Sequence, residues 1–209
     1  MTKDVPATMI FAFLTVIAIV IVVVVIYRNT DHSKVPRIFE SEKKRAGRRG
    51  ERIATNIIKE FLQEDDLLFT NVPVSYDGKN TELDNVIVNK YGVFIIEVKY
   101  YKGRLYGAED DYEWEKYKDD GYGNIFEKKV KNPIRQVKRQ TYILAKYLEH
   151  YGQRVWVEGY AFLVNGNSPI SSSYMLESIY DIDKAIHTFG KNRLDAQTVA
   201  SVAKLLSDD

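Results

Sequence analysis

The sequence contains no cysteine, so no framework of disulfide bonds can stabilise its fold. Its three histidines, His32, His150 and His187, are scattered and lack the spacing of zinc ligands, so each is predicted to lie on the surface. No glycine-rich loop of the kind that cradles phosphate is present, and Gly121-Tyr122-Gly123 is more simply explained as a flexible turn. The net charge of +1 excludes a uniformly basic protein, so basic character must be local.

One long apolar run stands out near the start of the chain. Residues 7–26 contain no charged side chain, and their only polar residues are Thr8 and Thr15. Twenty helical residues span about 30 Å, which is the thickness of the hydrocarbon core of a bilayer. A cleaved signal peptide would have a shorter apolar region and a small-residue cleavage site, and a buried globular helix would show a polar stripe. The sequence therefore predicts a transmembrane helix at 7–27, after a short extracytoplasmic N-terminus at 1–6.

Basic residues flank this run unequally. Lys3 is the only one before it. Those that follow are Arg28, Lys34, Arg37, Lys43, Lys44, Arg45, Arg48, Arg49 and Arg52. The positive-inside rule then predicts a single-pass protein of the cell membrane with its soluble domain in the cytoplasm. The basic linker at 28–46 is either a topology determinant that also contacts anionic lipid or a collar that helps to hold nucleic acid.

The remainder, 47–209, has the size of one domain with a single core. Helical spacing begins at Arg48 and ends near 63–66, and Asn132-Pro133 is a typical start for a second helix that runs to His150. Residues 108–131, around Trp114, are expected to form edge strands and an exposed loop. The other expected strands are 67–74, 83–88, 93–98, a short one in 103–107, and 155–164, and further helices are expected after Asp181 and over 195–206. This order predicts an α/β fold on a mixed sheet.

Three charged side chains on neighbouring strands point to chemistry. Glu97 and Lys99 are two residues apart, so both leave the same face of their strand. If Asn89–Gly92 forms a four-residue loop, Asp84 lies opposite Glu97, whereas a two-residue loop puts it opposite Lys99. Both registers leave all three side chains on one face.

Two paired carboxylates have Cβ atoms about 4.5–5.5 Å apart and repel each other unless a cation compensates. Mg²⁺ takes such oxygen ligands and activates bound water, and Lys99 would supply a point charge to the attacking water or the transition state. The alternative for Asp84, Glu97 and Lys99 is an exposed strand with a cross-strand salt bridge.

Several short motifs resemble, in order and spacing, those of the nuclease-related domain, or NERD, which is assigned to the PD-(D/E)xK nuclease superfamily. These motifs are Gly50-Glu51, Leu83-Asp84-Asn85-Val86-Ile87-Val88, Gly92-Val93-Phe94-Ile95-Ile96-Glu97-Val98-Lys99, Gly103, Trp114 and Asn132-Pro133-Ile134-Arg135-Gln136. The resemblance covers about 47–150 and leaves 151–209 as a C-terminal extension. It implies a restriction-endonuclease-like mixed sheet flanked by helices.

The resemblance also implies roles for individual residues. Asp84 and Glu97 would bind Mg²⁺ or Mn²⁺, and Lys99 would be the catalytic lysine. Glu51 and Gln136 would be further catalytic members of the site. For Glu51 the alternative is a first-turn acid that complements the helix dipole, and for Gln136 it is an ordinary solvated helix residue.

Nucleic-acid contacts are predicted at Tyr100 and Lys102, just past the site, and at Arg135 and Arg139, beside Gln136. A two-sided edge hairpin and a solvated basic helix face would give the same patterns. The first functional hypothesis is a metal-dependent nuclease at the cytoplasmic membrane face, acting on DNA in preference to RNA. The second is a tethered module that binds nucleic acid or protein without turnover.

Overall fold

The computed structural model describes residues 42–188 and 193–207. Glu42–Asp209 is one compact unit. The predicted transmembrane helix at 7–27 and the linker up to residue 41 lie outside the described residues. Among the residues that are described, no helix is long and apolar enough to cross a membrane.

The described chain alternates helices and strands much as the sequence predicts. The helices are α2 (Glu42–Glu60), α3 (Pro133–His150), α4 (Asp181–His187) and α5 (Ala196–Ser207). The strands are β1 (Leu67–Tyr76), β2 (Lys79–Asn89), β3 (Gly92–Lys99), β4 (Arg104–Tyr106), β5 (Glu113–Asp119), β6 (Ile125–Lys131), β7 (Val157–Leu163) and β8 (Met175–Leu176). Helix α2 begins at Glu42, near the end of the predicted linker 28–46, and ends at Glu60, before the predicted 63–66.

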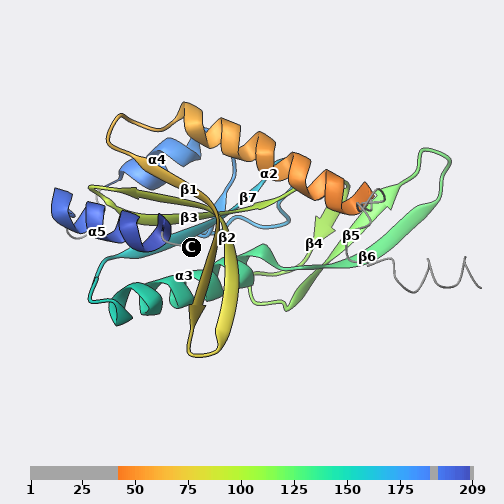
Figure 1. Cartoon of the computed structure of the whole chain (residues 1–209). Coiled ribbons are helices and arrows are strands. Elements are labelled where there is room, and N and C mark those ends of the chain that lie inside the picture. The colour runs from red at the N-terminus through yellow and green to blue at the C-terminus, as the bar shows by residue number, and fades with distance from the viewer. Residues whose placement is uncertain (1–41, 189–192, 208–209) are drawn as a thin grey trace, which may run out of the picture. The chain divides into compact units, whose positions relative to one another are not determined.

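Five strands form a mixed sheet in the order β1-β2-β3-β7-β8. The pairs β1–β2 and β2–β3 are antiparallel, whereas β3–β7 and β7–β8 are parallel. Helices cover both faces (Figure 1). The α/β prediction with a mixed sheet between helices is therefore confirmed. Strand β8 is too short to give a periodic signal, and the sequence did not predict it.

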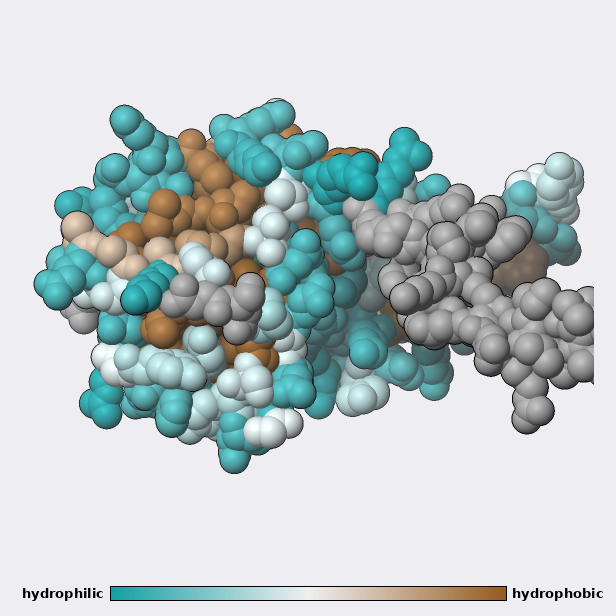
Figure 2. Space-filling model, viewed as in Figure 1, coloured by the Kyte–Doolittle hydropathy of each residue, from teal (hydrophilic) through white to brown (hydrophobic). Residues whose placement is uncertain are grey.

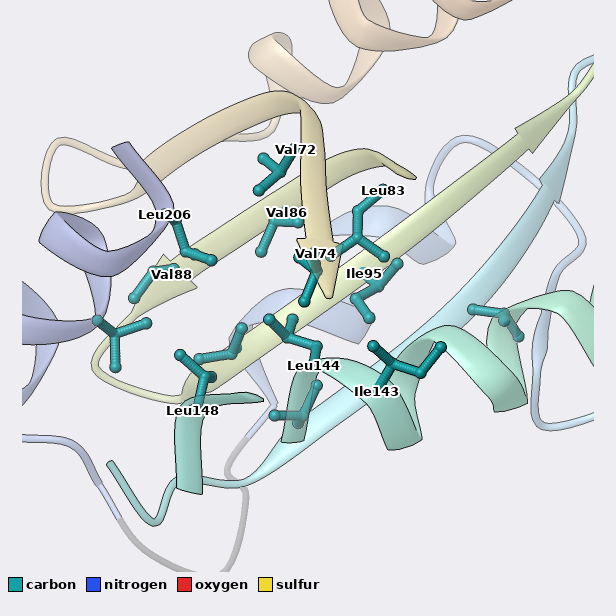
Figure 3. Close-up of a cluster of buried hydrophobic side chains, with 14 residues drawn as sticks. Val72, Val74, Leu83, Val86, Val88, Ile95, Ile143, Leu144, Leu148 and Leu206 are labelled. Carbon is teal, nitrogen blue, oxygen red and sulfur yellow. The ribbon is translucent and has the colours of Figure 1, made fainter. Parts of the chain in front are cut away.

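Alternation of apolar side chains along β2 and β3 divides the core into two layers. One layer packs under α3 and α5 and includes Val86, Ile95 and Leu144 (Figure 3). The other packs under α2 and α4 and includes Ile58 and Phe94. Because β3 is buried on both faces, it is the central strand that its apolar sequence predicts.

Residues 104–131 form a separate three-stranded sheet, β4-β5-β6, and not only edge strands around a loop. Trp114 anchors this sheet, since its ring is fully buried and its Nε1 donates to the Ala108 carbonyl at 2.9 Å. Gly107 lets the chain pass the ring, because a Cβ there would lie 2.1 Å from Trp114 Cδ1. The β5–β6 hairpin extends well beyond the body of the domain (Figure 1).

The prediction that all three histidines lie on the surface is wrong for His187. Its side chain is 9 % exposed and lies between two carboxylates, 2.8 Å from Asp66 Oδ2 and 2.6 Å from Asp183 Oδ1. Asp66 also accepts a hydrogen bond from the Asn89 amide at 2.9 Å. Since Asp66 and His187 are 121 residues apart, only the fold brings them together. His32 lies outside the described residues, and His150 is exposed as predicted.

Candidate active site

The candidate site lies where β2 and β3 separate. Their ladder runs from Asn89↔Gly92 to Asn85↔Ile96 and includes Val88↔Val93. The register is therefore the one that puts Asp84 opposite Glu97, but Asn89 and Gly92 are themselves paired, so the turn is Lys90-Tyr91 and not a four-residue loop. One further step puts Asp84 opposite Glu97, but that pair is not part of the ladder. Strand β3 continues in register with β7 through Lys99, whereas the outer half of β2 stays paired with β1. Asp84 and Glu97 therefore face each other across a fork.

Backbone distortion accompanies the fork on the β1 side as well. The β1–β2 ladder includes Thr70↔Asn85 and Val72↔Leu83 but omits the pair between them, Asn71 and Asp84. Asn71 has φ 55°, a left-handed conformation inside a strand that asparagine tolerates better than most residues. The site carboxylate Asp84 thus lies at a position where both neighbouring strands depart from regular pairing.

Site side chains form hydrogen bonds with backbone groups on both strands of the fork. Asp84 Oδ2 accepts a hydrogen bond from the Val98 N–H at 2.8 Å. On the other side, Gln140 Nε2 donates both to the Glu82 carbonyl at 3.1 Å and to Glu97 Oε2 at 2.6 Å. The side chains that form the site therefore also connect the two diverging strands.

Glu97 is fully buried and is the centre of the hydrogen-bond network. Gln136 Nε2 donates to its Oε1 at 2.6 Å, and Lys99 Nζ donates to the same oxygen. With Gln140 on Oε2, the carboxylate accepts three donors, which offsets much of the cost of burying its charge. The Oε1 atom of Gln140 is buried without a protein partner, so it is an acceptor available to a small ligand or a water.

Burial, followed by the charge of Glu97, raises the pKa of Asp84 to about 7, although the Val98 N–H and Lys99 act in the opposite direction. For Lys99, burial lowers the pKa, but the charge and the hydrogen bond of Glu97 outweigh it and the net pKa is raised. Lys99 is therefore protonated at neutral pH, and its side chain remains 21 % exposed. The group as a whole is a carboxylate pair with one cation.

Glu51 lies at the edge of this group. It is half-buried, and its charge contributes to the rise in the pKa of Asp84. One turn later on α2, Thr55 Oγ1 donates to Asn85 Oδ1 at 2.8 Å, which fastens the helix to β2 beside the site. Gly50 allows this approach, because a Cβ there would lie 2.6 Å from Tyr100 Cβ. The Gly50-Glu51 pair thus combines close packing with an acid near the site.

Helix α3 supplies the two amides, and its start is held as the sequence predicts. Asn132 Oδ1 accepts from the Ile134 N–H at 2.9 Å, which confirms the predicted N-cap. The Asn132 amide also donates to the carbonyls of Glu109 and Asp111, both at 2.8 Å. Sequence reasoning singled out Gln136 but missed Gln140, although their four-residue spacing puts both on one helix face.

Each of the residues predicted to contact nucleic acid also has a partner within the domain. Tyr100 packs against α2 with Lys102 Nζ 5.5 Å from its ring centre, while Arg135 donates to the Asp110 carbonyl at 3.1 Å and Arg139 to the Asn80 carbonyl at 3.1 Å. Lys102 is exposed and lines a pocket of about 870 Å³ on the small sheet. That pocket carries both signs of charge, through Lys102, Arg104, Lys118, Glu115 and Asp119.

The residues of the fork fit a divalent cation of the magnesium type. Asp84 and Glu97 offer hard carboxylate oxygens on facing strands. Burial, and after it the charge of Glu97, raises the pKa of Asp84, and a cation between the two carboxylates would oppose both effects. Among the described residues, no three Asp, Glu or His side chains are gathered closely enough to hold a metal by themselves. A cation here would need water or backbone oxygens as further ligands, which is the coordination that Mg²⁺ usually adopts.

Comparison with known proteins places this arrangement in a family. The family described as nuclease-related domain, NERD, matches residues 46–164, which is more than half of the chain. The chain belongs to the nuclease-related domain family. This assignment is consistent with membership of the PD-(D/E)xK superfamily.

An uncharacterized protein of Bacillus anthracis is 29 % identical to this NERD protein over 93 residues. The aligned part is 43 % of this chain and 41 % of that protein, so the chain spans about two fifths of the relative's length. No solved structure matches the chain significantly. The matched region of the family ends at residue 164, at the end of β7, and so contains the whole fork and α3.

Proposed function

We propose that this protein is a metal-dependent nuclease that hydrolyses phosphodiester bonds in nucleic acid, DNA in preference to RNA, at the cytoplasmic face of a membrane. The observation that carries the proposal is the fork, where Asp84, Glu97 and Lys99 converge within a nuclease-related domain. The predicted helix at 7–27, with basic residues after it, supports anchoring in the membrane.

Each residue has a role that follows from its contacts. Asp84 and Glu97 would hold Mg²⁺ or Mn²⁺, which supplies charge neutralisation at the phosphoryl group and a water of lowered pKa when bound. Gln136 and Gln140 keep the Glu97 carboxylate in one orientation through both of its oxygens. Lys99, protonated and partly exposed, presents positive charge at the edge of the site, where the transition state gains negative charge.

A cleavage assay on the full chain in lipid nanodiscs tests this proposal. Wild type is incubated with single- and double-stranded DNA and RNA in Mg²⁺, Mn²⁺ or chelator. Lys99→Met is expected to lower the rate about 100-fold or more, and Glu97→Gln to abolish it, whereas exposed Lys204→Met on α5 should leave the rate unchanged. Cleavage that persists in Glu97→Gln, or in wild type with chelator, would contradict the proposal.

A binding module without turnover is the second candidate, and one observation favours it. Glu97 is fully buried, and both of its oxygens already accept hydrogen bonds from protein donors, so the protein itself compensates the charge of this carboxylate. Nucleic-acid affinity that persists in Glu97→Ala, combined with no cleavage under any metal condition, would select this candidate.

A further inference from the structure

The tip of the β5–β6 hairpin carries large apolar side chains with nothing packed on them from the described chain. Tyr122 is 92 % exposed, Ile125 70 % and Phe126 58 %. Exposed apolar residues scattered singly are common, but three within five positions at the end of a projecting hairpin give its tip an apolar character that indicates a partner. Figure 2 shows hydrophobic surface on this hairpin at the right of the view.

The arrangement of these side chains indicates what kind of partner surrounds them. Ile125 pairs with Asp119 and Phe126 pairs with Lys118, so the two apolar residues lie on opposite faces of the hairpin, and Tyr122 lies at its turn. A flat protein surface would cover one face and leave the other in water. A lipid bilayer surrounds an inserted tip on all sides, and its interface favours aromatic residues.

The tip is also rigid enough to present these groups together. Asp120 Oδ1 accepts from the N–H groups of Tyr122 and Asn124, at 2.8 and 3.2 Å, and its Oδ2 accepts from the Asn124 amide at 2.7 Å. Asp119 Oδ1 accepts from the Gly121 N–H at 2.7 Å. Both tip carboxylates are therefore engaged in ordering the turn, which lowers the cost of bringing them to a membrane surface.

The position of the hairpin in the domain favours the membrane as partner. The chain enters the described domain at Glu42, and the N-terminal end of α2 and the hairpin tip lie at the same end of the domain (Figure 1). Only residues 28–41 separate Glu42 from the predicted transmembrane helix. A tether of that length keeps this end of the domain close to the bilayer.

We propose that Tyr122, Ile125 and Phe126 insert into the interface of the membrane in which residues 7–27 are anchored. This inference rests on the proposed anchoring but not on catalysis. Residues 113–131 contain five lysines, at 116, 118, 128, 129 and 131, against five acids, at 113, 115, 119, 120 and 127. Because these charges balance, the contact depends on apolar insertion and not on anionic lipid, and it changes little with salt.

The absence of cysteine allows a direct test with single-cysteine labelling of the full chain. Tyr122→Cys, Tyr180→Cys and Ile17→Cys are each labelled with an environment-sensitive fluorophore in nanodiscs that hold one chain and contain lipid with a spin-label quencher. Tyr180 is the matched control, because it is 76 % exposed and directly precedes α4, a helix that lies away from the β5–β6 hairpin (Figure 1). Emission is expected to be lost at positions 122 and 17 and retained at 180.

The outcomes separate this inference from its premise. Quenching at position 17 without quenching at 122 overturns the proposed hairpin contact but is consistent with the membrane anchor at 7–27. No quenching at either position overturns both. Adding Ile125→Ser and Phe126→Ser should restore emission at position 122 with an unchanged thermal unfolding midpoint, and persistent quenching in that variant would also overturn the proposal.

Discussion

At the scale of single residues, the electrostatics of the site depend on the repulsion between two buried carboxylates, Asp84 and Glu97. The charge of Glu97 is compensated by three hydrogen-bond donors. Asp84 accepts a hydrogen bond from one backbone N–H and lies near the charges of Glu97 and Glu51. The repulsion is therefore concentrated on Asp84, and burial with the charge of Glu97 raises its pKa to about 7. A residue in this state responds strongly to pH and to cations.

Stability should therefore depend on pH through Asp84. Its folded-state pKa lies above the ordinary value of 3.8, so the folded protein holds a proton that the unfolded chain has lost, and stability falls as pH rises from about 4 to about 7. Asp84→Asn is expected to remove this part of the fall. Thermal unfolding of both proteins in chelator across that range is the measurement, with exposed Glu113→Gln as the charge-matched control. If the stability of Asp84→Asn fell with pH as steeply as that of wild type, Asp84 would not be the source of the dependence.

At the scale of elements, the course of strand β1 decides where Asp84 lies. Every pair in the β1–β2 ladder follows one register, yet the pair of Asn71 and Asp84 is missing from it. The left-handed backbone of Asn71 lies at that gap. A strained conformation beside a candidate site is an observation from which a positioning role can be inferred.

Two substitutions at Asn71 should separate backbone conformation from side-chain contacts. Asn71→Gly accommodates the positive φ and is expected to stay within about 1 kcal/mol of wild type. Asn71→Val suits a regular strand but not the left-handed region, and should cost about 1–3 kcal/mol and weaken Mg²⁺ binding. Chemical denaturation and calorimetric titration measure the two effects. If the valine variant matches the glycine variant in both stability and Mg²⁺ affinity, the left-handed backbone of Asn71 does not position Asp84.

At the scale of the whole molecule, His187 connects two distant parts of the chain. It ends α4 and contacts Asp66 in the connection between α2 and β1, while Asp183 on the same helix contacts its other ring nitrogen. Burial lowers the pKa of His187, but the hydrogen bonds to Asp66 and Asp183 outweigh it and raise the net pKa above 6.5. The charged imidazole is therefore favoured in the fold.

This cluster should stabilise the protein most at lower pH. Because the folded-state pKa of His187 is raised, its contribution is complete below the unfolded value of 6.5 and is lost as pH rises through the folded pKa. His187→Gln should remove that dependence, and Asp183→Asn should reduce it, since Asp66 remains. NMR titration of the ring and denaturation at each pH test both statements. A ring that titrates below 6.5 would refute the assignment.

Much of this protein follows from local patterns in the sequence. Short apolar runs of strand type predict what become β1, β2, β3 and β7, and Asn132-Pro133 predicts the start of α3, because such runs and caps depend on residues a few positions apart. The shared face of Asp84, Glu97 and Lys99 was also predictable. A side-chain period of two keeps all three on one face in either register.

Tertiary packing alone decided the rest. The sequence left two hairpin registers open, and the structure has the one with Val88↔Val93. It did not say which helix covers which face; α3 and α5 cover one set of apolar side chains, and α2 and α4 cover the other. The second amide from Gln140 and the burial of His187 join residues 43 and 121 positions apart. The fork joins nearer residues, but it forms where β3 continues along the distant strand β7, as in the pair Lys99↔Leu163. Local periodicity carries no information about such pairs, since their approach depends on how whole elements pack.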